Sequence, residues 1–145
     1  MRGTSVTVLH TIVIYRNMKL PIRIVLLAAL FVLAGLMHFL MPGGYVSIMP
    51  PWVPWKMQLV YLSGVLEIAG GIGLLISFTR KWAAIGLIAL LIVVFPANIQ
   101  MLLNGIEAND SLLRIAALWL RLPLQPLLII VLYRIATSLP SRRAA

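Results

Sequence analysis

MQLVYLSGVLEIAGGIGLLI, residues 57–76, is a mainly apolar stretch with a single charged side chain, Glu67. A helix needs roughly 20 mainly apolar residues to cross the hydrocarbon core of a bilayer. Further stretches of the same character lie at residues 22–41, 82–103 and 112–135. Long continuous apolar runs are typical of membrane-spanning helices, whereas the strands of a membrane barrel alternate in hydrophobicity. The sequence therefore predicts four transmembrane helices.

The composition agrees with lipid as the solvent of this chain. Of its 145 residues, 62% are hydrophobic and 10% are charged, whereas soluble domains carry about 25% charged residues. The length suits one domain. The formal net charge of +9 raises the alternative of nucleic-acid binding, but the basic residues flank the apolar runs and form no single patch. We therefore expect a membrane protein with no nucleic-acid partner.

Charges beside the apolar segments predict the orientation, because cytoplasmic connections carry an excess of Lys and Arg. Basic residues lie at the N-terminal flank, in the second connection and at the C-terminal flank: Arg2, Arg16, Lys19, Arg23, Arg80, Lys81, Arg134, Arg142 and Arg143. The other two connections carry Lys56, Glu107 and Asp110. We predict an all-α integral membrane four-helix bundle at residues 22–136, with both termini cytoplasmic.

Two flanks lie outside this transmembrane domain. Residues 1–21 are a basic N-terminal flank whose apolar piece, 6–15, is too short to span, so it is either an interfacial strip or an extension. Residues 137–145 are a basic C-terminal tail. The first segment lacks the A-x-A pattern of a cleaved signal peptide, and we expect its helix to be retained.

The first connection, residues 41–56, is rich in aromatic residues and prolines. Tyr45, Trp52 and Trp55 suit the headgroup level of a bilayer. Four prolines, at positions 42, 50, 51 and 54, prevent a long helix there. Two interpretations stay open, a simple membrane anchor and a lid over a cavity.

Ionisable groups at bilayer depth are costly unless they are paired or hydrated, so each is a candidate site residue. Glu67 lies near the middle of its segment, and Arg121 lies about nine residues into the last one, or roughly 14 Å deep. Since both segments start on the same side, we expect a buried Glu67–Arg121 ion pair. Such a pair either forms part of a functional site or only locks the helices together, because buried pairs are weak evidence for stability.

The faces of the predicted helices support a shared polar interior. Arg114, Leu118, Arg121 and Gln125 follow one stripe, at i, i+4, i+7 and i+11. Around Glu67, the small residues Ser63, Gly64, Gly70 and Gly71 share a face that allows close helix packing. We expect Arg114, Arg121 and Gln125 to face protein or water.

The first and third segments add polar candidates. In the third, Pro96 cannot donate to the carbonyl of Ile92, and Asn98 lies toward the outer half. Asn98 either contacts a ligand or makes an interhelical hydrogen bond. His38, near the outer end of the first segment, is either an interfacial histidine or a proton carrier. Together with Glu67 and Arg121, these residues predict a polar pocket in the outer half.

The residue inventory excludes several chemistries. The chain has no cysteine and only two histidines, so thiol redox, iron–sulfur clusters and histidine-rich metal sites are excluded. It offers no serine–histidine–acid set and no paired embedded carboxylates. We therefore expect no metal, and no catalytic activity of the chain on its own.

Four strings resemble the DoxX family of small membrane proteins: SGVLEIAGGIGLL at 63–75, FPANIQM at 95–101, RLPLQ at 121–125 and GLMHF at 35–39. The resemblance implies a four-helix bundle of the bacterial inner membrane. It implies a link to membrane redox complexes, since the family takes its name from a subunit associated with thiosulfate:quinone oxidoreduction. The family positions that carry over are His38, Glu67, Asn98, Arg121 and Gln125.

These observations support three hypotheses on function. The first is an accessory or ligand-binding subunit that holds a quinone or lipid in the outer-half pocket, beside a membrane redox partner protein. The second is a small proton-coupled carrier that works as an oligomer, because embedded charge and a proline-broken helix are typical of transporters. The third is an assembly partner of another membrane protein, since glycine-rich faces suit helix docking.

Overall fold

The computed structural model of this protein describes residues 20–138, and this part of the chain consists of helices and connections without strands. The helices are α2 (Ile22–Leu40), α3 (Pro42–Ser47), α4 (Lys56–Leu75), α5 (Arg80–Glu107) and α6 (Leu112–Thr137). Four of them, all except α3, are long and apolar enough to cross a membrane, which confirms the four predicted long apolar helices. The predictions for residues 1–19 and 139–145 lie outside the described residues.

The long helices expose most of their apolar surface. Between 17% and 33% of the residues in the most apolar window of each helix are buried inside the molecule. Leu113 and Trp119 on α6 and Val93 on α5 are among the exposed large side chains. In water this much exposed apolar surface would be unfavourable, whereas lipid tails solvate it. The structure therefore supports an integral membrane protein.

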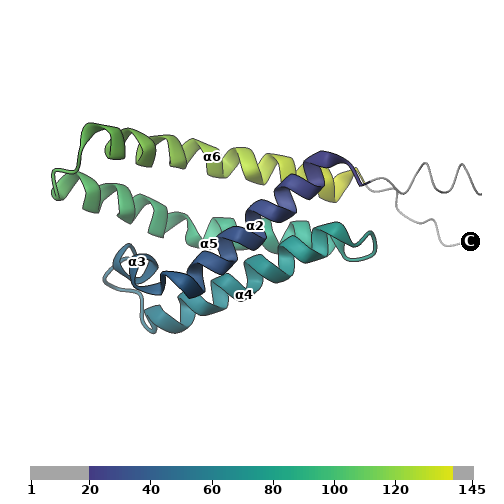
Figure 1. Cartoon of the computed structure of the whole chain (residues 1–145), viewed down its shortest axis with the longest axis horizontal. Coiled ribbons are helices and arrows are strands. Elements are labelled where there is room, and N and C mark those ends of the chain that lie inside the picture. The colour runs from purple at the N-terminus through teal and green to yellow at the C-terminus, as the bar shows by residue number, and fades with distance from the viewer. Residues whose placement is uncertain (1–19, 139–145) are drawn as a thin grey trace, which may run out of the picture.

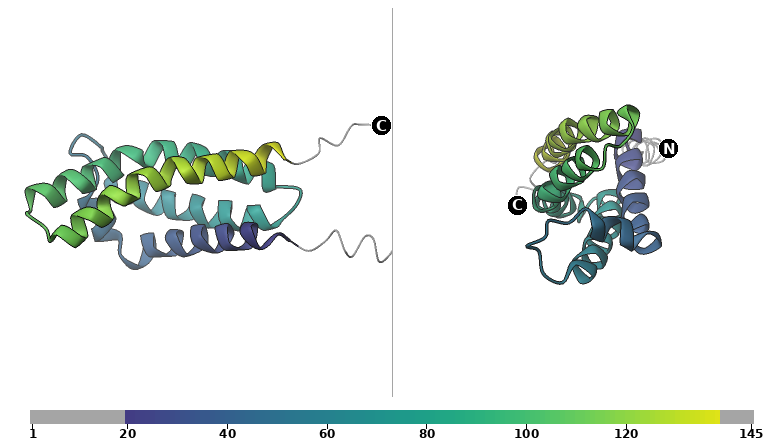
Figure 2. Two further views of the ribbon diagram at one scale, coloured as in Figure 1. Left: turned by 90° about the horizontal axis from the view of Figure 1, so that it is seen from above. Right: turned by 90° about the vertical axis from the view of Figure 1, so that its left-hand side faces the viewer.

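The four long helices form two antiparallel pairs (Figure 1). α2 packs along α4, α5 packs along α6, and α4 joins the two pairs through α5. α2 begins and α6 ends at the same end of the molecule, which we call the terminal end (Figure 2). The opposite end, which we call the α3 end, carries α3 and the turn between α5 and α6.

Glycines allow α2 and α4 to touch backbone to backbone. A Cβ atom on Gly64 would lie 2.9 Å from the carbonyl oxygen of Gly35, and one on Gly71 would lie 2.8 Å from that of Ala28. The expectation that the small residues around Glu67 allow close packing is confirmed for α2. Gly70 points to a different neighbour, because its Cβ would lie 2.5 Å from a methyl group of Leu87 on α5.

The buried polar residues lie to one side of the main apolar core. The apolar core joins all four long helices near the terminal end, with Phe31, Leu74, Leu87 and Leu132 among its members. The buried polar side chains are His38, Ser63, Glu67 and Gln125. They lie on the helix segments between this core and the α3 end, where Val60, Leu102 and Leu118 are buried as well.

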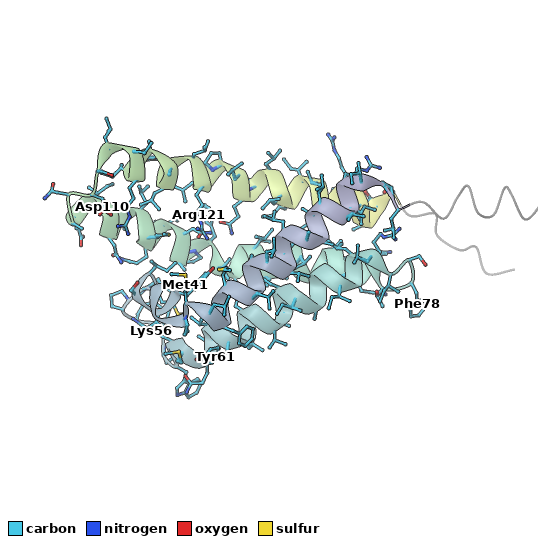
Figure 3. All side chains as sticks on the ribbon, viewed as in Figure 1. Met41, Lys56, Tyr61, Phe78, Asp110 and Arg121 are labelled. Carbon is cyan, nitrogen blue, oxygen red and sulfur yellow. The ribbon has the colours of Figure 1, made fainter. Side chains whose placement is uncertain are left out.

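The two helix pairs, which we call the first hairpin (α2 and α4) and the second hairpin (α5 and α6), differ in length. α5 and α6 have 28 and 26 residues, against 19 in α2 and 20 in α4. At 1.5 Å per residue the difference is about 10 Å. The extra length extends beyond α3, and Asp110 in the α5–α6 turn lies well beyond Met41 and Lys56 along the long axis (Figure 3). Two residues that lie the same number of positions after the start of α4 and of α6 are therefore at different heights along the long axis of the molecule.

The close approach of α2 and α4 predicts the effect of a single added methyl group. Gly64→Ala places a Cβ 2.8 Å from the Cβ of His38, and overpacking of this kind costs about 1–3 kcal/mol. Gly86→Ala is the matched control, because a Cβ at Gly86 meets nothing within 4 Å. Thermal unfolding in mild detergent should show a lower melting temperature for Gly64→Ala and no loss for Gly86→Ala. Equal melting temperatures would contradict the tight α2–α4 contact.

Candidate functional site

His38 on α2 and Glu67 on α4 meet inside the molecule. The Nδ1 atom of His38 lies 3.5 Å from Oε2 of Glu67, and the two side chains are only 9% and 10% exposed. The same Nδ1 atom lies 2.9 Å from the carbonyl oxygen of Ala34. Side chains lean toward the N-terminus of their own helix, and α2 and α4 are antiparallel, so these two side chains lean toward each other.

Tyr45 covers this pair from the α3 end. Its ring stacks on the His38 ring with centroids 3.8 Å apart and planes 23° from parallel. Burial in this stack raises the pKa of the Tyr45 phenol above its ordinary value. From its sequence Tyr45 was predicted only as an interfacial aromatic residue, because nothing in its spacing connects it with His38.

A hydrogen bond ties the segment after α2 to α5. The amide Nδ2 of Asn104 donates to the carbonyl oxygen of Ser47 over 3.1 Å, and its Oδ1 accepts from Gln100 at 2.7 Å. The first connection therefore lies over the α3 end of the helices and contacts both hairpins. In contrast, Trp52 and Trp55 are 74% and 76% exposed, which suits membrane anchors. The two interpretations of this connection, an anchor and a lid, remain predictions.

A chain of hydrogen bonds, which we call the amide relay, links α6 to α5. Nε of Arg121 donates to Oδ1 of Asn98 over 3.0 Å, and Nδ2 of Asn98 donates to Oε1 of Gln125 over 2.7 Å. Nε2 of Gln125 in turn donates to the carbonyl oxygen of Leu91. Arg121, Asn98 and Gln125 were predicted separately as site residues, and the structure joins them. The backbone acceptor is Leu91 and not Ile92, whose carbonyl Pro96 leaves without its usual donor.

The predicted ion pair between Glu67 and Arg121 is wrong. The described part of the chain contains the pairs His38–Glu67 and Arg114–Asp110, and no bond joins Glu67 to Arg121. One reason is helix order, since α4 packs on α2 and α5 while α6 packs on α5. The other reason is position along the long axis, because α6 projects past α3 and places Arg121 near the level of Met41 (Figure 3).

Arg121 lies within electrostatic range of Glu67, His38 and Tyr45, although it bonds to none of them. Its side chain is exposed in the isolated molecule, and among the described residues only Asn98 bonds to it, through Nε. The two terminal amino groups of its guanidinium therefore remain available to another molecule.

Arg114 does not join the site. Its Nε lies 3.1 Å from Oδ2 of Asp110 near the start of α6. The predicted polar stripe of α6 is therefore divided. Leu118 and Gln125 are buried, whereas Arg114 and Arg121 are exposed. The stripe was expected to face protein or water, and Arg114 does so by pairing with Asp110 at the projecting end of α6, which packs on α5 alone.

Two buried atoms of the site lack a hydrogen-bond partner, namely Oγ of Ser63 and Oε2 of Glu67. Ser63 precedes Glu67 by one helical turn, so both lie on the same face of α4. Buried polar atoms are normally satisfied, and an exception calls for an explanation such as bound water or ligand. We refer to His38, Ser63, Glu67, Asn98, Arg121 and Gln125, with Tyr45 above them, as the polar cluster.

Other features of the surface are less specific. An apolar groove of about 210 Å³ is lined by Leu91, Ile92, Phe95, Gln125, Pro126 and Ile129. Acyl chains of surrounding lipid would fill such a groove in a membrane, so it does not indicate a particular ligand. Residues 20–138 contain no group of three or more potential metal ligands.

The amide relay predicts a specific loss of stability. Gln125→Leu leaves Nδ2 of the half-buried Asn98 without its acceptor, and loss of a hydrogen bond of this kind costs about 1 kcal/mol. Gln58→Leu, at an exposed glutamine of α4, is the matched control. We expect a lower melting temperature in detergent for Gln125→Leu only. If both variants melt like the parent protein, the relay does not contribute to stability.

Comparison with known proteins gives one match. A family model described as Domain of unknown function (DUF8561) matches residues 27–136. No curated protein and no solved structure matches the chain.

Proposed function

Since the chain belongs to the DUF8561 family, whose function is unknown, its activity has to be inferred from its own residues, and we propose that it binds a lipophilic small molecule inside the membrane. The proposed role is that of an accessory or ligand-binding subunit in membrane redox chemistry, with a quinone or a lipid as ligand. The resemblance of residues 35–128 to the DoxX family supports the redox setting.

The observation that carries this proposal is the unused hydrogen-bonding capacity of the polar cluster. Oγ of Ser63 and Oε2 of Glu67 are buried without a partner, and the terminal amino groups of Arg121 have none among the described residues. Unpaired polar groups at membrane depth are costly. A bound molecule with a polar head would satisfy these groups, while its apolar tail would remain in lipid.

The cluster divides into groups that contact the ligand and groups that position them. The side-chain amides of Asn98 and Gln125 are already engaged with each other, so their part is to orient Arg121. Arg121 then donates to an oxygen of the ligand head, as a quinone carbonyl or a lipid ester offers. Glu67 and His38 exchange a proton with the head or accept a hydrogen bond from it.

The proposed setting is a four-helix bundle of a bacterial inner membrane with both termini in the cytoplasm. Arg23, Arg80, Lys81 and Arg134 lie at the terminal end of the described helices, where the positive-inside rule places the cytoplasm. The α3 end then faces outward, and the polar cluster lies in the outer half.

A proton-coupled carrier is the second candidate, and the His38–Glu67 contact is the observation that favours it. Embedded histidine and acid side chains form proton relays in pumps and transporters. Four spans offer little room for a pathway, so several copies would be required. Proton-dependent flux into liposomes that is lost in Glu67→Gln would favour the carrier over the binding subunit.

Binding of a lipophilic head predicts that Arg121 is required for ligand affinity. We expect mass spectrometry of protein purified in mild detergent to detect a co-purified quinone or lipid, and decyl-ubiquinone to raise the melting temperature. A hydrogen bond to a charged group contributes about 1.5–3 kcal/mol, so Arg121→Gln should weaken binding about tenfold or more. The control is Arg114→Gln, an exposed arginine of the same helix outside the cluster. Absence of any co-purified ligand together with no stabilisation would refute the proposal.

A further inference from the structure

The unused groups of the polar cluster have opposite hydrogen-bonding character. An arginine guanidinium only donates, whereas an ionised carboxylate only accepts. The terminal amino groups of Arg121 therefore need an acceptor, and Oε2 of an ionised Glu67 needs a donor. Because Glu67 and Arg121 do not bond to each other, each keeps this capacity for a third group.

From this complementarity we propose that the polar cluster selects a neutral ligand head that carries a hydroxyl group beside an acceptor oxygen. The hydroxyl donates to Oε2 of Glu67, and the acceptor oxygen takes a hydrogen bond from Arg121. The inference rests on the proposed function and narrows its ligand to hydroxyl-bearing neutral amphiphiles, as opposed to anionic ones or to heads with acceptors alone.

The charges of the cluster argue for a neutral head. Arg121 and an ionised Glu67 contribute opposite charges to the cluster. A phosphate head would satisfy Arg121, but it would place a second negative charge near a carboxylate that is only 10% exposed. Like charges in a poorly solvated site repel strongly, so an anionic head should bind less well than a neutral one.

The engaged amides argue for a hydroxyl group on the ligand. Asn98 donates to Gln125, and Gln125 donates to the Leu91 carbonyl, and among the described residues neither amide bonds to Glu67. His38 directs Nδ1 at the Ala34 carbonyl, at 2.9 Å, more closely than at Glu67, at 3.5 Å. The donor that Oε2 of Glu67 lacks must then come from the ligand or from water.

Three probes with the same oleoyl chain test the selectivity. Monoolein offers a neutral head with hydroxyl groups and an ester, methyl oleate offers the ester alone, and oleoyl lysophosphatidate is anionic. Their affinities for the full-length protein in mild detergent are measured by native mass spectrometry and thermal shift. We expect monoolein to bind about tenfold more tightly than either of the others, as for one missing hydrogen bond to a charged group.

The Glu67→Gln variant tests which group is responsible. An amide both donates and accepts, so this variant should bind monoolein and methyl oleate with affinities within about twofold of each other. Glu107→Gln, the same substitution at an exposed acid of α5, should keep the preference of the parent protein. Should Glu67→Gln fail to fold, the ranking of the three probes on the parent protein still decides.

The outcomes separate this inference from the function on which it rests. Lysophosphatidate or methyl oleate binding as tightly as monoolein would overturn the selectivity and leave a lipophilic binding site in place. An unchanged preference in Glu67→Gln would overturn the role of Glu67. If none of the probes binds and decyl-ubiquinone gives no stabilisation either, the proposed function itself fails.

Discussion

The close contact between α2 and α4 is the constraint on which the site depends. Gly35 faces Gly64, and Ala28 faces Gly71, with no room for a further Cβ atom. Helices in lipid gain little from the hydrophobic effect and associate through such close packing. At this separation the leaning side chains of His38 and Glu67 come within 3.5 Å of each other. A wider spacing would leave an acid in the membrane without a neighbour.

The second hairpin brings the opposite charge by a different route. Arg121 on α6 reaches the site through Asn98 and Gln125, and the relay ends on a backbone carbonyl of α5. Each amide uses its donor toward the next acceptor, so the guanidinium is held in place without an acid partner. The apolar core near the terminal end joins the hairpins, while the polar groups remain toward the α3 end. This arrangement explains how one small protein can combine stable helix packing with unsatisfied polar atoms.

The four spans were predictable because each depends on local composition. Roughly 20 apolar residues suffice to identify a membrane helix whatever it packs against. The small-residue face around Glu67 was also predictable, since helical spacing alone defines it. The Glu67–Arg121 pair was predicted wrongly, because the depth argument assumed that both helices start at the same level. Tyr45 and Asn104 were missed as members of the site region, since their contacts join segments with no shared periodicity.

By itself, the sequence determined that this chain has four apolar helices, a charge asymmetry between their ends, and an acid and an arginine inside the apolar segments. These properties follow from the local chemistry of each segment and its transfer into lipid. Only the tertiary structure decided that Glu67 faces His38 and that Arg121 faces Asn98. The reason is that the order and projection of neighbouring helices are set by the packing of whole surfaces, which no single segment encodes.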